Sequence, residues 1–321
     1  MKQVWHTYKF FMHTNLQYLQ RKHLDTQKWD RCIANAANGL LYAHSFYLDQ
    51  MAGNWDALVL GDYEAVMPLT WRRKFGISYL YQPFVTASLG VFSSLPIDAV
   101  LMEAFISNIP RKFKLIDIDL NPGNNALSGK HITPRKNYEL KLNGAYETLL
   151  QQYNRHARRK LKKADEAGLR IVEDIPVDTI AGLSFNMMQG RDVVSKADYD
   201  RFVQLCKDIH PHVEACNSMA AVDANGNIIA SDINIVYNKR IYSLLAGNTP
   251  GSNENGGFYF VLDQLIKKYA GTGYVLDFEG SDIPGIAFLF ECLGGQLTWY
   301  PHLTINRLPP IIRTLKKLKY Q

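Results

Sequence analysis

The order of secondary structure that this sequence predicts occurs twice along the chain. Each half begins with helices, continues with a meander of short strands, and closes with a strand, a helix and a last strand. In the second half the turn of the meander falls at Asn225-Gly226, a strong hairpin signal. The two halves share this pattern without clear sequence identity. A doubled pattern of this kind predicts a mixed α/β fold of two similar domains, each a mostly antiparallel sheet flanked by helices.

The length of the chain supports the same division. At 321 residues it exceeds the size at which a single core usually keeps growing. We place the boundary near Leu142–Gly144, between the last strand of the first half and the first helix of the second. The predicted domains are 1–142 and 143–305, followed by a basic tail over 306–321.

Composition describes an ordinary globular protein, with 47% hydrophobic and 21% charged residues. The four cysteines are widely scattered, which argues against a disulfide framework and favours a reducing compartment. No signal peptide or membrane-spanning stretch is evident, so a cytoplasmic location is expected. Cys206, His210, His212 and Cys216 have a spacing that resembles a metal cluster, but Pro211 interrupts the helix, and we expect no metal.

Positive charge is concentrated in one predicted helix. Residues 151–170 hold seven Lys or Arg against two acids, a net +5 in a chain whose total is +6. At helical spacing a stripe of small apolar residues lies opposite a face of cations suited to phosphate. The apolar stripe is Ala157, Leu161, Ala164 and Gly168, and the cationic face is Arg155, Arg158, Arg159 and Lys162. A solvated helix face with no ligand is the alternative.

A second candidate phosphate site is the loop "NTPGSNENGG" over 248–257. It joins a strand to a helix, and Gly256 and Gly257 stand where that helix begins. Bare backbone N–H groups at a helix N-terminus form a natural cradle for pyrophosphate. Neither a Walker motif nor G-x-G-x-x-G is present, so a plain surface loop stays open as the alternative.

The stretch "YVLDFEGSDIPG" offers candidate acids. On a strand, Asp277 and Glu279 fall on one face, and either carboxylate at a strand end could act as a general base. Ser281 or Asp282 could instead cap the helix that starts near Pro284.

Two of these segments resemble a known family. "YNRHARRKLKKADEAGLRI" is similar to the "Y-x-x-N-x-R-R-x-L-K-K-A-x-x-x-G-L-x-I" segment of Fem-type aminoacyl transferases, with a one-residue shift at Asn154. "DFEGSDIPGIAFLFECLGGQ" resembles the "D-F-x-G-[GS]" close of the same group. That group belongs to the GNAT acyltransferase superfamily, and its Fem-like branch carries two fused GNAT-like domains. In that branch the C-terminal tail can fold back on the first domain.

The resemblance implies roles for several residues. The backbone of Leu245, Ala246 and Gly247 would hold the acyl carbonyl as an oxyanion stabiliser. The following loop, with Asn248, Ser252, Asn255, Gly256 and Gly257, would take the phosphates of the donor. Asp277 or Glu279 would be the base, and Tyr242 a proton donor to the leaving group.

The sequence departs from the GNAT pattern at two places. The GNAT phosphate motif is replaced by "PGSNENGG", and the helix that often supplies a general-acid Tyr offers Phe288, Phe290 and Cys292 instead. Both departures fit a Fem-like donor better than coenzyme A in its usual pose.

The sequence leaves three functions open. The first is a GNAT-type N-acyltransferase that moves an acyl group from acyl-CoA, used as a co-substrate, to an amine. The second is a Fem-like transferase that uses aminoacyl-tRNA and acts on a cell-wall precursor or a related amine. The third is a non-enzymatic domain that binds a polyanion, either nucleic acid or anionic lipid.

Overall fold

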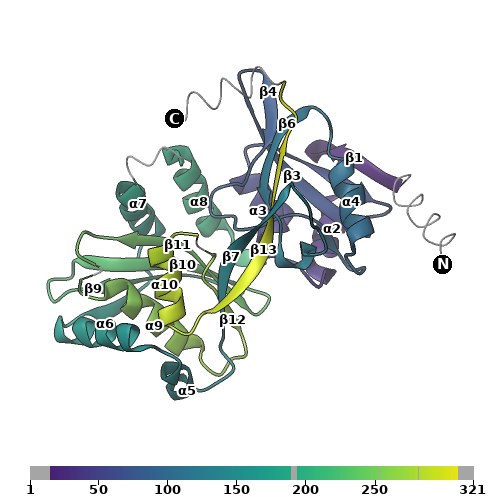
Figure 1. Ribbon diagram of the computed structural model, residues 1–321. Coiled ribbons are helices and arrows are strands. Elements are labelled where there is room, and N and C mark those ends of the chain that lie inside the picture. Colours follow the sequence, from purple (N-terminus) through teal and green to yellow (C-terminus); the bar gives the residue numbers. More distant parts are fainter. Residues whose placement is uncertain (1–14, 189–193, 253, 281, 310–321) are drawn as a thin grey trace. The chain divides into compact units, whose positions relative to one another are not determined.

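The computed structural model describes residues 15–188, 194–252, 254–280 and 282–309 (Figure 1). The chain divides into two units, one formed by residues 1–135 and 299–321 and the other by residues 136–298. The sequence analysis put the boundaries at 142/143 and 305/306. In the structure the units instead change at 135/136 and 298/299. Both of these positions lie inside long strands, where neither a linker nor a change of composition marks them.

Within the described residues, the first unit has its own short strands and three α-helices. Its helices are α2 (Thr26–Asn35), α3 (Ser45–Met51) and α4 (Ala99–Ser107). Its strands are β1 (Leu16–Gln20), β2 (Trp55–Leu60), β3 (Ala65–Lys74), β4 (Ile77–Leu80), β5 (Phe92–Ser93) and β6 (Phe113–Asp119). Among these, β2, β3 and β4 form an antiparallel meander, and β6 returns parallel to β4 after α4. Buried side chains of α4, such as Leu101 and Phe105, pack in one core with those of the sheet.

The second unit repeats this order. Its helices are α5 (Tyr146–Gln151), α6 (Arg155–Glu166), α7 (Val177–Met188), α8 (Lys196–Asp208), α9 (Gly257–Tyr269) and α10 (Pro284–Cys292). Its strands are β8 (Arg170–Glu173), β9 (Ala215–Val222), β10 (Ile228–Tyr237), β11 (Arg240–Asn248) and β12 (Val275–Asp277). Here β9, β10 and β11 form the antiparallel meander, and β12 returns parallel to β11 after α9. The predicted duplication of a mixed α/β unit is therefore confirmed.

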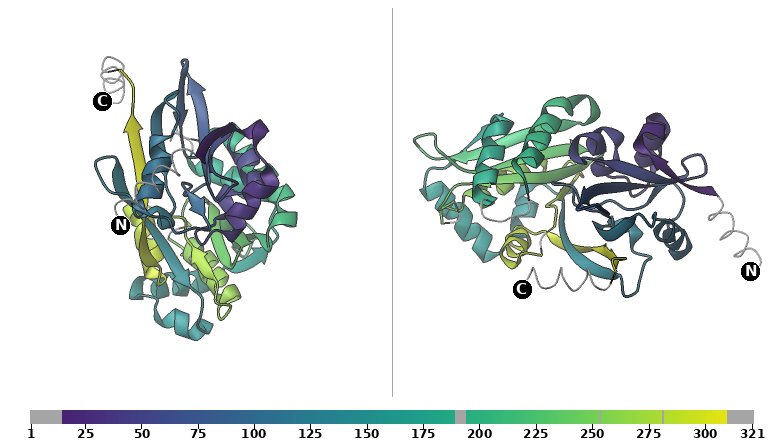
Figure 2. Two further views of the ribbon diagram at one scale, coloured as in Figure 1. Left: turned by 90° about the vertical axis from the view of Figure 1, so that its right-hand side faces the viewer. Right: turned by 90° about the horizontal axis from the view of Figure 1, so that it is seen from above.

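Two long strands complete the sheets. β7 (Ile132–Lys141) follows β6 in sequence but pairs antiparallel with β12 of the second unit. β13 (Gln296–Asn306) follows the second unit but pairs antiparallel with β6 of the first, and it is drawn in yellow in Figure 2. Each unit thus takes one strand from the other half of the chain.

Helices cover both faces of the sheet in the second unit (Figure 1). α7 packs on β11 and β10 from one face, and α8 packs on α7. On the other face α9 packs on β10 and β9, and α6 packs on α9. The core between α9 and the sheet is apolar and includes Val261, Leu265 and Leu276.

Local sequence explains several boundaries of these elements. Asn154 caps α6 by accepting hydrogen bonds from the backbone N–H groups of His156 and Ala157. Between β9 and β10, Asp223 accepts hydrogen bonds from the backbone of Asn225 and Asn227, while Gly226 takes a positive φ of 84°. The predicted hairpin turn is therefore confirmed.

Candidate functional site

The candidate site is centred on β11, which keeps its parallel partner for only part of its length. β12 pairs with Arg240–Tyr242, and beyond Tyr242 the parallel pairing stops while β11 continues along β10 to Asn248. Leu245, Ala246 and Gly247, predicted to hold the acyl carbonyl, lie on this continuation. A strand that parts from its neighbour leaves one edge of its backbone unpaired by that neighbour, which is the geometry needed for binding a carbonyl.

Gly247 has a packing role at this position. A Cβ there would press on the carbonyl oxygen of Ile180 in α7, and the carbonyl of Gly247 already accepts a hydrogen bond of 2.6 Å from Ser231 Oγ. On the side of β11 that faces α7, the space at Gly247 is therefore occupied by α7 and the Ser231 side chain.

Asp277 ends β12 in a buried ion pair. Its Oδ2 lies 2.6 Å from the guanidinium of Arg240, and its Oδ1 accepts from Asn137 Nδ2 and from the backbone N–H of Glu279, both at 3.0 Å. Burial raises the pKa of Asp277, and the charge of Arg240 opposes that rise. Both carboxylate oxygens already accept hydrogen bonds, so the geometry holds Asp277 as a fixed partner of Arg240.

Arg240 is a residue that the sequence analysis did not single out. Its guanidinium also lies 2.7 Å from Glu139 on β7. Burial lowers the pKa of Arg240, but the charges of Asp277 and Glu139 outweigh it and keep the pKa above its usual value. The only sequence signal was the position of a lone cation at the start of an apolar strand.

Glu279 does not continue the strand. β12 ends at Asp277, and Glu279 has a φ of 65°, in the left-handed region. The strand alternation that put Glu279 on the face of Asp277 therefore stops two residues too early. Tyr242, the third predicted catalytic residue, is fully buried on β11 in register with Asp277.

The predicted phosphate loop packs tightly against α6. At Gly256, the N-cap of α9, φ is 72°, and a Cβ would overlap the backbone carbonyl of Lys160. A Cβ at Gly257 would meet side chains of β10, and the N–H of Gly257 donates to the carbonyl of Ser252, which is itself buried. The two glycines thus allow α9 to approach α6 and β10. Asn248 is half-buried at the end of β11, and Asn255 is exposed in the loop.

The basic helix has the two faces that its spacing predicts, except that Gly168 lies beyond the end of α6 and is exposed. Ala157 and Ala164 are fully buried, and Leu161 packs against the same core. The four predicted phosphate ligands, Arg155, Arg158, Arg159 and Lys162, are all exposed.

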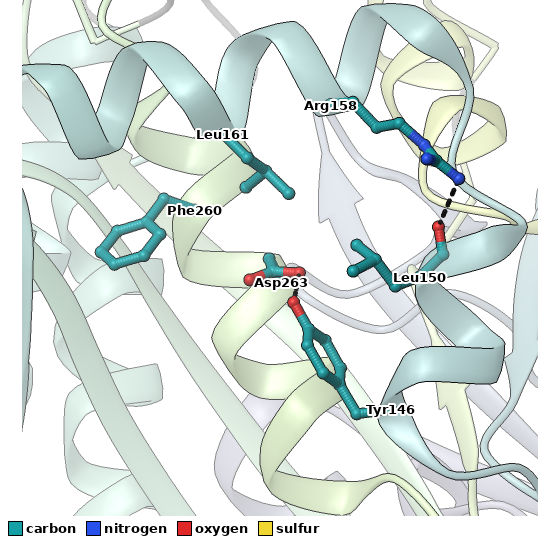
Figure 3. Close-up of a pocket in the computed structure, with 6 residues that line it drawn as sticks. All are labelled: Tyr146, Leu150, Arg158, Leu161, Phe260 and Asp263. Carbon is teal, nitrogen blue, oxygen red and sulfur yellow. Dashed lines mark hydrogen bonds between the residues drawn. The ribbon is translucent and has the colours of Figure 1, made fainter.

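Their existing contacts differ. Arg158 turns back onto α5, donating to the carbonyls of Tyr153 and Leu150 at 3.1 and 3.2 Å (Figure 3). Arg159 contacts His156 Nδ1, and Lys162 lies 3.7 Å from Glu166. Arg155 has no side-chain partner in the described ranges, so among the four cations it is the one that no existing contact holds.

A buried polar network on β10 also escaped the sequence analysis. Asp232 is fully buried and accepts hydrogen bonds from Ser243 Oγ at 2.7 Å and Asn234 Nδ2 at 3.1 Å. Burial raises the pKa of Asp232 to about 6, against the effect of these two donors. The sequence showed only an acid in an alternating strand.

Among the described residues, no three His, Cys, Asp or Glu side chains gather closely enough to hold a metal ion. In that part of the chain no helix is both long enough and apolar enough to cross a bilayer. Of the predicted basic tail, Arg307 follows β13 and donates to backbone carbonyls at 109 and 110, while residues 310–321 lie outside the described ranges.

Comparisons with known proteins identify the fold. No protein-family model matches the sequence, and no curated protein matches it either. Among solved structures, FemX shares 13% identity and a TM-score of 0.62, covering 95% of this chain and 100% of its own. A conserved protein of unknown function from Bacteroides thetaiotaomicron VPI-5482 shares 8% identity and a TM-score of 0.57, covering 88% and 97%. L-PGS from Bacillus licheniformis shares 10% identity and a TM-score of 0.54, covering 90% and 94%.

These matches show which fold the chain has. It has a GNAT-like, Fem-like fold along nearly its whole length, as the sequence motifs implied. The mixed α/β architecture with a helix-flanked sheet is confirmed with it. At 8–13% identity the comparisons establish the fold and leave the reaction to the geometry of the site.

Proposed function

We propose that this protein is a Fem-like transferase that moves an aminoacyl group from aminoacyl-tRNA to an amine. The observation that carries the proposal is the exposed cationic face of α6, with Arg155, Arg159 and Lys162 turned to solvent. A polyanion with regularly spaced phosphates is the ligand such a face suits, because each neutralised phosphate releases counterions.

The position of α6 supports the choice of donor. Its Lys160 carbonyl lies against Gly256, so the basic helix is adjacent to the loop that follows β11. The same contact brings α6 against the N-terminus of α9, where the pyrophosphate of acyl-CoA would be expected to bind. These features favour tRNA over the acyl-CoA donor that the sequence analysis placed first.

The reaction would follow the chemistry of an ester and an amine. The amine nitrogen attacks the ester carbonyl, a C–N bond forms, and the C–O bond to the tRNA ribose breaks. The amine proton must be lost, which costs about 4–5 kcal/mol at pH 7 for a group of pKa ~10.4, and the ribose oxygen gains a proton. Under this proposal Glu279 takes the first proton, because both oxygens of Asp277 are already engaged by Arg240, Asn137 and the backbone. Tyr242 supplies the second proton, and the backbone of Leu245–Gly247 stabilises the oxyanion.

The first experiment measures how tRNA binding depends on salt. Replacing Arg155 and Arg159 with Ala should reduce the slope of log K against log salt by up to about 2, since each lost phosphate contact is worth ~0.9. The matched control replaces Lys196 and Lys207 on α8 with Ala, an equal change in charge. These lysines already pair with Asp200 and Asp178, and the slope should stay as in the wild type.

The second experiment separates the three functions. The wild type should transfer a labelled amino acid from mixed aminoacyl-tRNA to a member of an amine panel. One-to-one binding of acetyl-CoA that survives physiological salt, with no tRNA transfer, would replace this proposal with the acyl-CoA reaction. Salt-sensitive tRNA binding without any transfer, unaffected by Glu279→Gln, would identify a binding domain.

A further inference from the structure

A small cavity in the second unit shares no lining residue with strands β11 and β12 of the candidate site. It is an open hollow with a volume of about 310 Å³, lined by residues of α5, α6 and α9 (Figure 3). Its lining residues are Tyr146, Leu150, Arg158, Leu161, Phe260 and Asp263.

Asp263 supplies a buried acidic group to this cavity. The residue is only 3% exposed, and its Oδ1 accepts a hydrogen bond of 2.7 Å from the hydroxyl of Tyr146. Its Oδ2 accepts from Gln264 Nε2 at 3.0 Å. Within the described ranges Asp263 forms no salt bridge. Burial raises its pKa, and the hydroxyls of Tyr146 and Tyr153, the amide of Gln264 and then the charge of Lys267 oppose the rise. A buried carboxylate without a paired cation is costly, so the cavity contains an acid that a cationic ligand would stabilise.

The nearest guanidinium is committed elsewhere. Arg158 lines the cavity, but its Nε and Nη2 donate to the backbone carbonyls of Tyr153 and Leu150 at the end of α5. Figure 3 shows the guanidinium turned toward Leu150 and away from Asp263. Arg158 therefore caps the C-terminal end of α5 and does not pair with the carboxylate of Asp263.

A second polar group lies beside the carboxylate. The hydroxyl of Tyr153 is buried and makes no hydrogen bond of good geometry among the described residues. Burial raises the pKa of Tyr153, and the charge of Asp263 and a hydrogen-bond interaction with it raise the pKa further. A ligand with more than one N–H donor could satisfy both.

The remaining walls are apolar. Leu150 and Leu161 turn their side chains toward the space in front of Asp263, whereas the ring of Phe260 is turned away from the carboxylate (Figure 3). From this arrangement we infer that the cavity is a binding site for a small primary ammonium ion with an apolar body, paired with Asp263. The inference does not depend on the donor or the reaction proposed above.

The test titrates the full-length protein with 2-phenylethylammonium and, separately, with the neutral 2-phenylethanol. Wild type should bind the ammonium ion at least tenfold more tightly than the alcohol. Asp263→Asn, which keeps an acceptor for Tyr146, should reduce the affinity for the ammonium ion at least tenfold and leave that for the alcohol unchanged. Asp208→Asn, an exposed acid on α8, is the matched control and should bind as wild type does.

A second variant keeps the charge and reduces the space. Leu150→Phe should weaken binding of the ammonium ion while Asp263 is retained. If Asp263→Asn does not fold, this variant serves as the test of whether the ammonium ion binds in the cavity. The inference is overturned if wild type binds neither compound, if it binds both equally, or if the folded variants bind as wild type does.

Discussion

At the scale of single residues, Arg240 organises the charges where β11, β12 and β7 meet. One guanidinium neutralises two carboxylates, Asp277 at 2.6 Å and Glu139 at 2.7 Å. Asn137 and the backbone of residue 279 complete the shell around Asp277. Removing Arg240 therefore leaves two acids close together in a largely buried place.

Replacing Arg240 with Met should lower the free energy of unfolding by about 3 kcal/mol, the usual cost of breaking a buried pair from one side. Asp277→Asn should cost less, because Arg240 keeps Glu139 as its partner. Urea denaturation at pH 7 measures both. Equal losses in the two variants would contradict this account of Arg240.

At the scale of elements, the contact between α6 and α9 depends on one backbone position. Gly256 has a positive φ and lies against the carbonyl of Lys160, so a side chain there meets both strain and overlap. Gly251, five residues earlier, has a φ of 86°, but a Cβ added there would meet nothing within 4 Å, so only the strain applies.

We expect Gly256→Ala to destabilise the protein by more than about 2 kcal/mol and Gly251→Ala by about 1 kcal/mol, the cost of a left-handed L-residue. Thermal or urea unfolding of the pair measures the difference, with Gly251→Ala as the control for backbone strain. If the two variants were equally stable, the approach of α6 to α9 would not require a glycine.

The pairing of β13 with β6 carries a pH-sensitive contact. His302 on β13 lies 3.0 Å from Asp117 and 2.7 Å from Asp119. These two carboxylates raise the pKa of His302 to about 9, although burial and Arg135 oppose them. Because the folded pKa is above the usual value of about 6.5, the stabilisation is complete below that pH and is lost as the pH rises through about 9.

The stability advantage of wild type over His302→Gln should therefore be largest near pH ~6 and shrink between about pH 6.5 and 9. Urea unfolding of both proteins across this range measures it, and an NMR titration of the imidazole gives the pKa directly. An advantage that does not change with pH would show that His302 is neutral in the folded protein.

At the scale of the whole molecule, the exchange of strands makes each unit depend on the other half of the chain. β6 carries Ile116 and Ile118 into the core of the first unit, and Leu303 of β13 packs in the same core. Without β13, the edge of β6 would expose unpaired backbone groups and apolar side chains.

A chain of residues 15–135 should consequently fail to fold alone, whereas adding a peptide of residues 299–309 should restore structure. Circular dichroism with and without the peptide tests this, and a peptide carrying Leu303→Asp serves as the control. Cooperative unfolding of residues 15–135 by themselves would show that β13 is dispensable.

The features that could be predicted from the sequence are those governed by neighbours along the chain. The hairpin at Asn225–Gly226 follows from turn chemistry, the buried stripe of Ala157 and Ala164 from helical spacing, and the repeated order of elements from alternation and periodicity. The motifs around α6 and after β12 carried the resemblance to Fem-type proteins, and the fold match to FemX agrees with it.

The tertiary structure decided what depends on residues far apart in sequence. Arg240 meets Asp277 and Glu139 only because β11 pairs with β12 and β12 with β7. Gly256 is required by the nearby carbonyl of Lys160, and Asp263 became a ligand candidate only because α5, α6 and α9 pack side by side around it. Composition and spacing show which side chains are present. Their charge and their partners depend on burial and on pairing across the sheet. Burial and sheet pairing arise only when distant segments of the chain pack together.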